Sequence, residues 1–252
     1  MRLLRSDTLE PVEFMPNQIP PYAILSHTWE DEEVSFEELM GHDKAWQNKA
    51  GWKKIVAFAE IASSDGYQYV WADTCCIDKK SSAELQEAIN SMYKWYRDSQ
   101  VCYAYLSDVM IGPPVEGRSA VEGVQGSAFR EARWFRRGWT LQELLAPHHV
   151  VFFDQEWNQI GDKTTLLEYL EEITGIDERF LSSPAMVPEA SVAERMSWMA
   201  GRQTTRDEDI AYCMLGIFGI HMPMLYGEGH TAFARLQEKI MKVNDDSTLL
   251  AW

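Results

Sequence analysis

Residues 67–106 read YQYVWADTCCIDKKSSAELQEAINSMYKWYRDSQVCYAYL, and this stretch decides the fold. It opens with an aromatic and apolar run, residues 67–73, and closes with a similar run, residues 101–106; both are typical of buried strands. Between them, residues 81–99 place apolar side chains on one face at helical spacing. The stretch therefore predicts a strand, a helix and a second strand, which is the repeating unit of a parallel sheet.

The same alternation continues outward in both directions. Upstream, residues 22–27 (YAILSH) form another short apolar run, and residues 49–64 have the spacing of a helix. Downstream, a loop rich in Gly and Pro is expected over residues 112–126, followed by a short helix at 139–145 and a strand at 149–154 (HVVFFD). Four strands that alternate with helices predict an α/β fold in which helices flank both faces of a parallel sheet.

After residue 160 the pattern becomes helical. Ser191 with Glu194, and Thr205 with Glu208, have the spacing of a capping box at a helix start. We expect an α/β domain over residues 1–160 and a helical C-terminal region over residues 161–252 packed on it. The helices expected in that region cover residues 164–173, 191–199, 207–218 and 231–243.

The charge balance argues against nucleic acid as the main partner. The chain has 23 basic and 39 acidic residues, and the net charge of −16 repels phosphate backbones and acidic lipid surfaces. One local cluster of arginines runs against this trend, and it is either a solvated helix face or a basic patch. Its members are Arg130, Arg133, Arg136 and Arg137.

The cysteine pattern indicates a reducing compartment. The four cysteines have neither a CxxC pair nor a Cys/His spacing typical of zinc, so we expect reduced thiols and no metal site. The N-terminus lacks the apolar core of a signal peptide, and the most apolar run, residues 210–220, is too short to span a bilayer. We therefore expect a cytoplasmic protein without a membrane span.

Polar side chains follow the predicted strands at the points where the strands end. Because the carboxyl ends of parallel strands face the same edge of a sheet, functional groups collect there. The rule points to one cleft that brings together residues far apart in the sequence. After the first three strands these residues are Ser26, His27, Thr28, Trp29, Asp73, Thr74, Cys75, Cys76, Asp78, Ser107 and Asp108.

Three blocks of sequence carry a family resemblance. They are YAILSHTW at residues 22–29, WADTCCIDK at 71–79 and RRGWTLQELLAP at 136–147. Together they resemble the heterokaryon incompatibility (HET) domain of fungal proteins that act in programmed cell death and innate immunity, over residues 20–155. Residues 190–243 resemble the helical region that follows this domain in many of these proteins. One departure is Glu30, where the family usually has Gly after the Trp.

HET domains look like distant relatives of TIR domains, which include enzymes that cleave NAD⁺. The resemblance therefore implies a TIR-like sheet and NAD⁺ hydrolysis. In TIR enzymes a Trp is followed four residues later by the catalytic Glu on a short helix. Trp139 and Glu143 have that spacing, which places both on one helix face. The resemblance thus implies that Glu143 is catalytic and that NAD⁺ is the substrate, with no separate cofactor.

A carboxylate suits this chemistry. Cleaving the nicotinamide–ribose bond builds positive charge on the ribose, which a buried carboxylate stabilises. Aromatic faces such as those of Trp29 and Trp139 would stack on nicotinamide or adenine. The residues expected to bind the substrate are Ser26, His27, Trp29, Asp73, Cys76, Asp78 and Trp139.

Each assignment has a plainer alternative. Glu143 is alternatively a helix-face residue paired with an arginine, Trp139 a core residue and Asp73 the cap of the next turn. Cys75 or Cys76 with His27 would form a thiol–histidine nucleophile pair. For the whole domain, the alternative is a non-catalytic module that signals by homotypic assembly.

The resemblance also implies partners beyond NAD⁺. TIR-like enzymes are commonly completed by a neighbouring subunit, so we expect a homo-oligomer. Related proteins continue into nucleotide-binding and repeat modules. Such modules, or a partner incompatibility protein, are the other partners that the resemblance implies.

Overall fold

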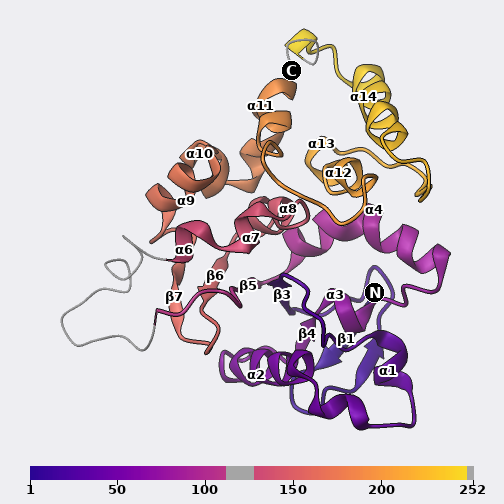
Figure 1. Cartoon of the computed structure of the whole chain (residues 1–252), viewed down its shortest axis with the longest axis vertical. Coiled ribbons are helices and arrows are strands. Elements are labelled where there is room, and N and C mark those ends of the chain that lie inside the picture. The colour runs from indigo at the N-terminus through magenta and orange to yellow at the C-terminus, as the bar shows by residue number, and fades with distance from the viewer. Residues whose placement is uncertain (112–127, 249–252) are drawn as a thin grey trace.

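The computed structural model describes residues 1–111 and 128–248 and centres on one seven-stranded sheet (Figure 1). The strands lie in the order β2-β1-β4-β3-β5-β6-β7. β4, β3, β5 and β6 are mutually parallel, whereas β1, β2 and β7 pair antiparallel at the two edges. The strand bounds are β1 Arg2–Arg5, β2 Pro11–Glu13, β3 Ala23–His27, β4 Tyr69–Trp71, β5 Val101–Tyr105, β6 Val150–Phe153 and β7 Gln159–Asp162.

The α/β fold with a largely parallel sheet confirms the prediction from sequence. The four predicted strands are the four parallel ones, β3 to β6. The three antiparallel strands β1, β2 and β7 were not predicted, because each is only three or four residues long and alternates too little to give a pattern. The expected loop at residues 112–126 lies outside the described residues.

Long helices cover the two faces of the sheet. α2 (Ala50–Ser64) connects β3 to β4, and α4 (Ser82–Asp98) connects β4 to β5. The two connections run in opposite directions along the sheet, so right-handed crossovers place the two helices on opposite faces. Figure 1 shows α2 on the lower side of the sheet and α4 on the upper side. The Ser81 hydroxyl starts α4 by accepting the N–H of Glu84.

Burial on both faces explains why the first three residues of β3 are apolar. All five of its residues are buried, as expected for a central parallel strand. Its neighbours are held in register by pairs such as Ala23 with Val70 on β4 and Ala23 with Val101 on β5. The last two residues, Ser26 and His27, are polar and lie at the carboxyl end of the strand.

Short helices fill the connections of the first 160 residues. α3 follows β4 directly, and α8 lies between β5 and β6 in the sequence. α8 contacts both α4 and β3, so it crosses the end of the central strand. The bounds are α1 Phe36–Met40, η1 Ala45–Asn48, α3 Asp73–Cys76, α6 Ala128–Glu131, α7 Arg133–Arg136 and α8 Thr140–Leu145.

The C-terminal part is helical, as predicted, and packs on α4 and α8. The division of the chain at residue 160 stays a prediction; β7 spans that point. No helix within the described ranges has both the length and the apolar character needed to cross a membrane. The elements are α9 Leu167–Thr174, α10 Glu178–Ser182, η2 Pro184–Glu189, α11 Val192–Ser197, α12 Asp209–Tyr212, α13 Leu215–Phe218 and α14 Thr231–Val243.

Of the two predicted capping boxes, one is confirmed and one is wrong. Ser191 and Glu194 cap α11 reciprocally. Glu208 forms no such box with Thr205. Its carboxylate instead accepts the backbone N–H groups of Gly227 (2.7 Å) and Gly229 (3.0 Å), which ties the start of α12 to a distant turn.

The contact between α13 and α4 depends on the absence of a side chain at Gly216. A Cβ atom built on Gly216 lies only 2.0 Å from the Cβ of Tyr93 on α4. We expect Gly216→Ala to lower the free energy of unfolding by about 1–3 kcal/mol, the usual cost of overpacking. Urea unfolding followed by circular dichroism measures the change.

Gly41→Ala is the control, because the nearest atoms to its added methyl group are carbonyl oxygens at 3.2 Å. It should cost clearly less than the substitution at Gly216. Equal unfolding midpoints for Gly216→Ala and the wild type would contradict the close packing of α13 on α4.

Candidate functional site

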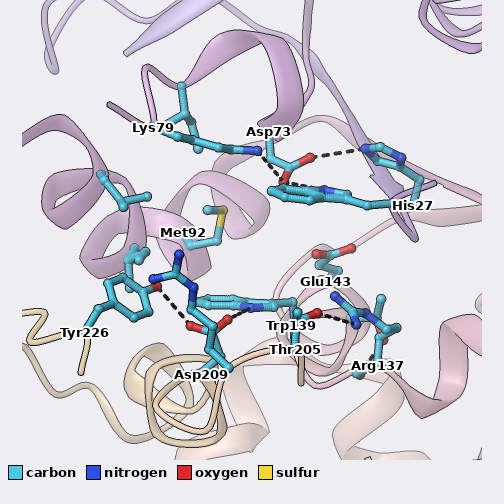
Figure 2. A pocket seen from close by; sticks show the side chains of 16 residues that line it. His27, Asp73, Lys79, Met92, Arg137, Trp139, Glu143, Thr205, Asp209 and Tyr226 are labelled. Atoms are coloured by element: carbon cyan, nitrogen blue, oxygen red, sulfur yellow. Dashed lines mark hydrogen bonds and ion pairs between the residues drawn. The ribbon is translucent and has the colours of Figure 1, made fainter. Parts of the chain in front are cut away.

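A cavity of about 420 Å³ opens beyond the carboxyl ends of β3 and β4 (Figure 2). Its volume lies within the range of ligand-binding pockets. Figure 2 shows His27 and Asp73 on one side, Trp139 and Asp209 on the other, and Glu143 between them. The lining comprises His27, Trp29, Asp73, Ile77, Lys79, Leu85, Ile89, Met92, Arg137, Trp139, Thr140, Glu143, Thr205, Arg206, Asp209 and Tyr226.

Glu143 forms the floor of this pocket. It belongs to α8 and is only 8% exposed. The Ser26 hydroxyl at the end of β3 donates a hydrogen bond to Glu143 Oε2. The same hydroxyl accepts the indole N–H of Trp134 at 2.7 Å. A fully buried Ser26 thus holds the carboxyl group in place through a chain of two hydrogen bonds.

Burial raises the pKa of Glu143 to about 8, and the negative charge of Asp73 adds to the rise, although the hydrogen bond from Ser26 opposes it. Burial therefore favours the protonated form of this carboxyl group at neutral pH. A cationic group bound nearby would favour the ionised form. A carboxyl group that ionises when a cation arrives is well suited to stabilise developing positive charge.

The first wall of the pocket is organised around Asp73, the first residue of α3. Its carboxylate contacts His27 Nε2 at 3.1 Å, accepts the indole N–H of Trp29 at 2.9 Å and lies 3.7 Å from Lys79 Nζ. Burial alone would raise the pKa of Asp73, but the charge of Lys79 and the bond to His27 outweigh it and lower this pKa well below its ordinary value. Asp73 is therefore a fixed negative charge.

The indole of Trp29 is the exposed part of this wall. It is 49% exposed, and Lys79 Nζ lies 3.4 Å from the centre of its ring system. A cation over an indole face at this distance is favourable. The ring is thus held at its N–H by Asp73 and at one face by Lys79.

The second wall comes from α8 and the C-terminal region. Asp209 accepts the indole N–H of Trp139 at 3.3 Å and the hydroxyl of Tyr226 at 2.9 Å. Burial raises the pKa of Asp209. Each wall therefore carries an indole whose N–H is bonded to a carboxylate, Trp29 to Asp73 and Trp139 to Asp209.

The start of α8 is bonded to the C-terminal region. The largely buried Arg202 guanidinium donates to the carbonyl of Arg137 at 2.9 Å and to the hydroxyl of Thr140 at 3.0 Å. Gly138 lies beside this point, and its backbone N–H donates to the carbonyl of Gln203 at 2.9 Å. These bonds fix Trp139 and Glu143 relative to the segment that supplies the second wall.

The structure brings six of the eight candidate residues to this site. His27, Trp29, Asp73, Trp139 and Glu143 line the pocket, and Ser26 lies directly behind Glu143. Cys76 and Asp78 lie elsewhere.

Local hydrogen bonds account for the positions of Cys76 and Asp78. Cys76 is the buried last residue of α3, and its sulfur accepts the N–H of Ala72 at 3.5 Å. Asp78 accepts the N–H groups of Lys80 and Ser81 and so shapes the turn before α4.

The geometry gives no support to the alternative thiol–histidine pair. Cys75 and Cys76 are both buried and neither lines the pocket that His27 faces. Burial also raises the pKa of the Cys76 thiol, which disfavours the nucleophilic thiolate. Within residues 1–111 and 128–248, no group of His, Cys, Asp and Glu side chains is placed to hold a metal ion.

Several lining residues were not predicted from the sequence. Lys79 lies within one of the motif blocks and Arg137 within another, but nothing in their spacing assigns them a role. The segments RQTTRDEDI and MLYGEG carry the others, and they too belong to the stretch that resembles a known family. The missed residues are Lys79, Arg137, Thr205, Arg206, Asp209 and Tyr226.

Comparison with known proteins identifies two matches. Residues 22–111 match the model of the family described as heterokaryon incompatibility protein (HET). The chain is also 48% identical to the vegetative incompatibility protein HET-E-1 of Podospora anserina over 99% of its own length. It spans only 18% of that larger protein. No solved structure matches the chain.

The burial of Glu143 makes stability depend on pH. Its pKa rises from an ordinary 4.5 to about 8 on folding, so within this window the folded state keeps a proton that the unfolded state loses. Stability therefore falls as pH rises through the window, by up to about 1.4 kcal/mol per pH unit. Glu143→Gln removes this titration, so the melting temperature of the variant should increasingly exceed that of the wild type between about pH 5 and about pH 8.

Glu168→Gln is the matched control, because Glu168 is exposed on α9. Its melting temperature should follow the wild-type curve at every pH. A constant difference between Glu143→Gln and the wild type over this range would show that Glu143 ionises normally in the folded protein.

Proposed function

Because the chain belongs to the heterokaryon incompatibility (HET) family, we propose that it is the cytoplasmic cell-death effector domain of an incompatibility protein and that it acts by hydrolysing NAD⁺. The observation that carries the enzymatic part is the buried carboxyl group of Glu143, held by Ser26 at the floor of a pocket with an indole on each wall. The name of the Podospora anserina relative supports the cellular role, since that protein acts in vegetative incompatibility.

The proposed reaction breaks the bond between the ribose C1′ carbon and the nicotinamide nitrogen. The bonding electron pair goes to the nicotinamide ring, which leaves as a neutral molecule, and positive charge develops on the ribose. Water then adds to C1′ and loses a proton. The products are nicotinamide, ADP-ribose and H⁺, so atoms and charge balance.

Glu143 would act on the charge that develops in this reaction. The pyridinium ring of NAD⁺ is itself cationic, so its arrival would lower the pKa of Glu143 and leave a carboxylate beside the ribose. As the bond breaks, positive charge moves from the ring to the ribose, toward that carboxylate. Because the group is buried, its attraction for the charge is stronger than it would be in water.

The two pocket indoles would hold the cationic ring. Their faces attract a flat cation through the quadrupole of the ring system. Trp29 and Trp139 are each anchored by a hydrogen bond to a carboxylate, so little side-chain entropy is lost on binding. The arrangement suits a planar cationic ligand better than a neutral aliphatic one.

Glu143→Gln is the direct test of catalysis. The amide keeps the size of the side chain but removes the charge, and loss of one such preorganised group typically costs about 10²–10³ in rate. We expect the variant to remain folded while NAD⁺ cleavage, followed by release of nicotinamide, falls by that factor and toxicity is lost. Glu168→Gln should change neither. A folded Glu143→Gln protein that cleaves NAD⁺ at the wild-type rate would refute the catalytic role.

We also propose that self-association controls the activity, because a constantly active NAD⁺ hydrolase would kill the cell that makes it. Specific activity should then rise with protein concentration, or when the chain is fused to an inducible dimerisation domain. Constant activity per molecule over a wide dilution series would identify a self-sufficient monomer. A clustered wild-type protein that releases no nicotinamide but still kills cells would favour the non-catalytic assembly module.

A further inference from the structure

Two guanidinium groups on the second wall of the pocket form no ion pair with a carboxylate of residues 1–111 or 128–248. Arg137 donates to the hydroxyl of Thr205 at 3.2 Å, and the guanidinium carbon of Arg206 lies 4.4 Å from the ring centre of Tyr226. Both arginines line the cavity. The arginines that form ion pairs within the described part of the chain are Arg2, Arg5, Arg97, Arg130, Arg133, Arg179 and Arg235.

Both arginines are connected to the same short segment of the chain, residues 205 and 206. Thr205 receives the hydrogen bond from Arg137, and Arg206 is the next residue in the chain. Figure 2 shows Arg137 and Thr205 joined on the side of the pocket that carries Trp139. Arg137, Thr205 and Arg206 all line the cavity, so two guanidinium groups and one hydroxyl group are available on this wall.

The charges of the pocket indicate a role for these arginines in binding an anionic ligand. Three carboxyl groups line the cavity, Asp73, Glu143 and Asp209, and the chain as a whole carries a net charge of −16. An anionic ligand would be repelled unless cations compensate. Lys79 already lies 3.7 Å from Asp73 and over Trp29, so Arg137 and Arg206 are the lining cations whose donors remain available to an anion.

We propose that Arg137 and Arg206, with the hydroxyl of Thr205, form the subsite for the pyrophosphate group of the dinucleotide; this assignment rests on the NAD⁺ hydrolysis proposed above. A guanidinium group donates two parallel hydrogen bonds to a phosphate, which fixes orientation as well as affinity. Arg206 is exposed, whereas Glu143 is buried at the floor. The phosphates therefore bind at the mouth, and the nicotinamide end reaches inward between the two indoles.

The test uses ADP-ribose, which carries the pyrophosphate but has no nicotinamide bond to cleave. We would titrate it by calorimetry into the wild type, Arg206→Gln and Arg137→Gln. Losing hydrogen bonds to a charged group should weaken binding by about 10–100-fold. Arg136→Gln is the matched control, because Arg136 is exposed, adjacent in sequence and absent from the lining; it should bind like the wild type.

Arg206→Gln gives the cleaner kinetic readout, because Arg137 lies close enough to Glu143 to lower the pKa of its carboxyl group. A group that binds the phosphates equally in the ground and transition states changes KM and not kcat. For NAD⁺ cleavage, Arg206→Gln should therefore raise KM about tenfold or more with kcat nearly unchanged. Binding of nicotinamide riboside, which has no phosphate, should be the same in the variant and the wild type.

The outcomes separate this proposal from the proposed function. Weaker binding of ADP-ribose by Arg206→Gln and Arg137→Gln supports the subsite even if the wild type cleaves no NAD⁺. Equal affinity in the wild type and both variants overturns the subsite even if NAD⁺ is cleaved. A wild-type protein that binds no ADP-ribose at millimolar concentration overturns it as well.

Discussion

The pocket depends on one buried hydrogen bond, from the hydroxyl of Ser26 to the carboxyl group of Glu143. It joins the end of the central strand β3 to the short helix α8 and so fixes the distance between sheet and floor. Burial raises the pKa of this carboxyl group, and Ser26 opposes the rise only with a dipole, because its hydroxyl carries no positive charge. A buried acid held in this way is costly to ionise, and for that reason it responds strongly to a cation.

The two walls of the pocket come from segments that are far apart in the sequence. The first wall comes from the ends of β3 and β4, and the second from α8 and residues 205–226. The family model covers residues 22–111 and thus only the first wall. Trp139, Glu143, Asp209 and Tyr226 all lie outside it. A fragment defined by that match alone would contain Asp73 but would lack Glu143 on the floor of the pocket.

The sequence predicts the elements that are buried on both sides. β3, β4, β5 and β6 are dense in apolar residues and alternate with long helices, so their type and order can be read directly. The same reading places Ser26 and Asp73 near one edge, because parallel strands end together, whereas Glu143 was assigned through the family resemblance. This reading fails for Asp78, whose carboxylate serves the local turn before α4. It also misses Asp209 and Tyr226, because their approach to Trp139 depends on tertiary packing and leaves no periodic signal.

The short antiparallel strands at the margins of the sheet limit how copies of the chain can meet. β2 has three residues and begins with Pro11, which has no N–H to donate, and β7 has four residues. Such edges are poor templates for adding a strand from another molecule, so they guard against amyloid-like growth. Contacts between copies would then fall to the helical surfaces, where side chains rather than backbone groups determine recognition. An assembly built in that way would be specific and reversible, which suits the control by self-association proposed above.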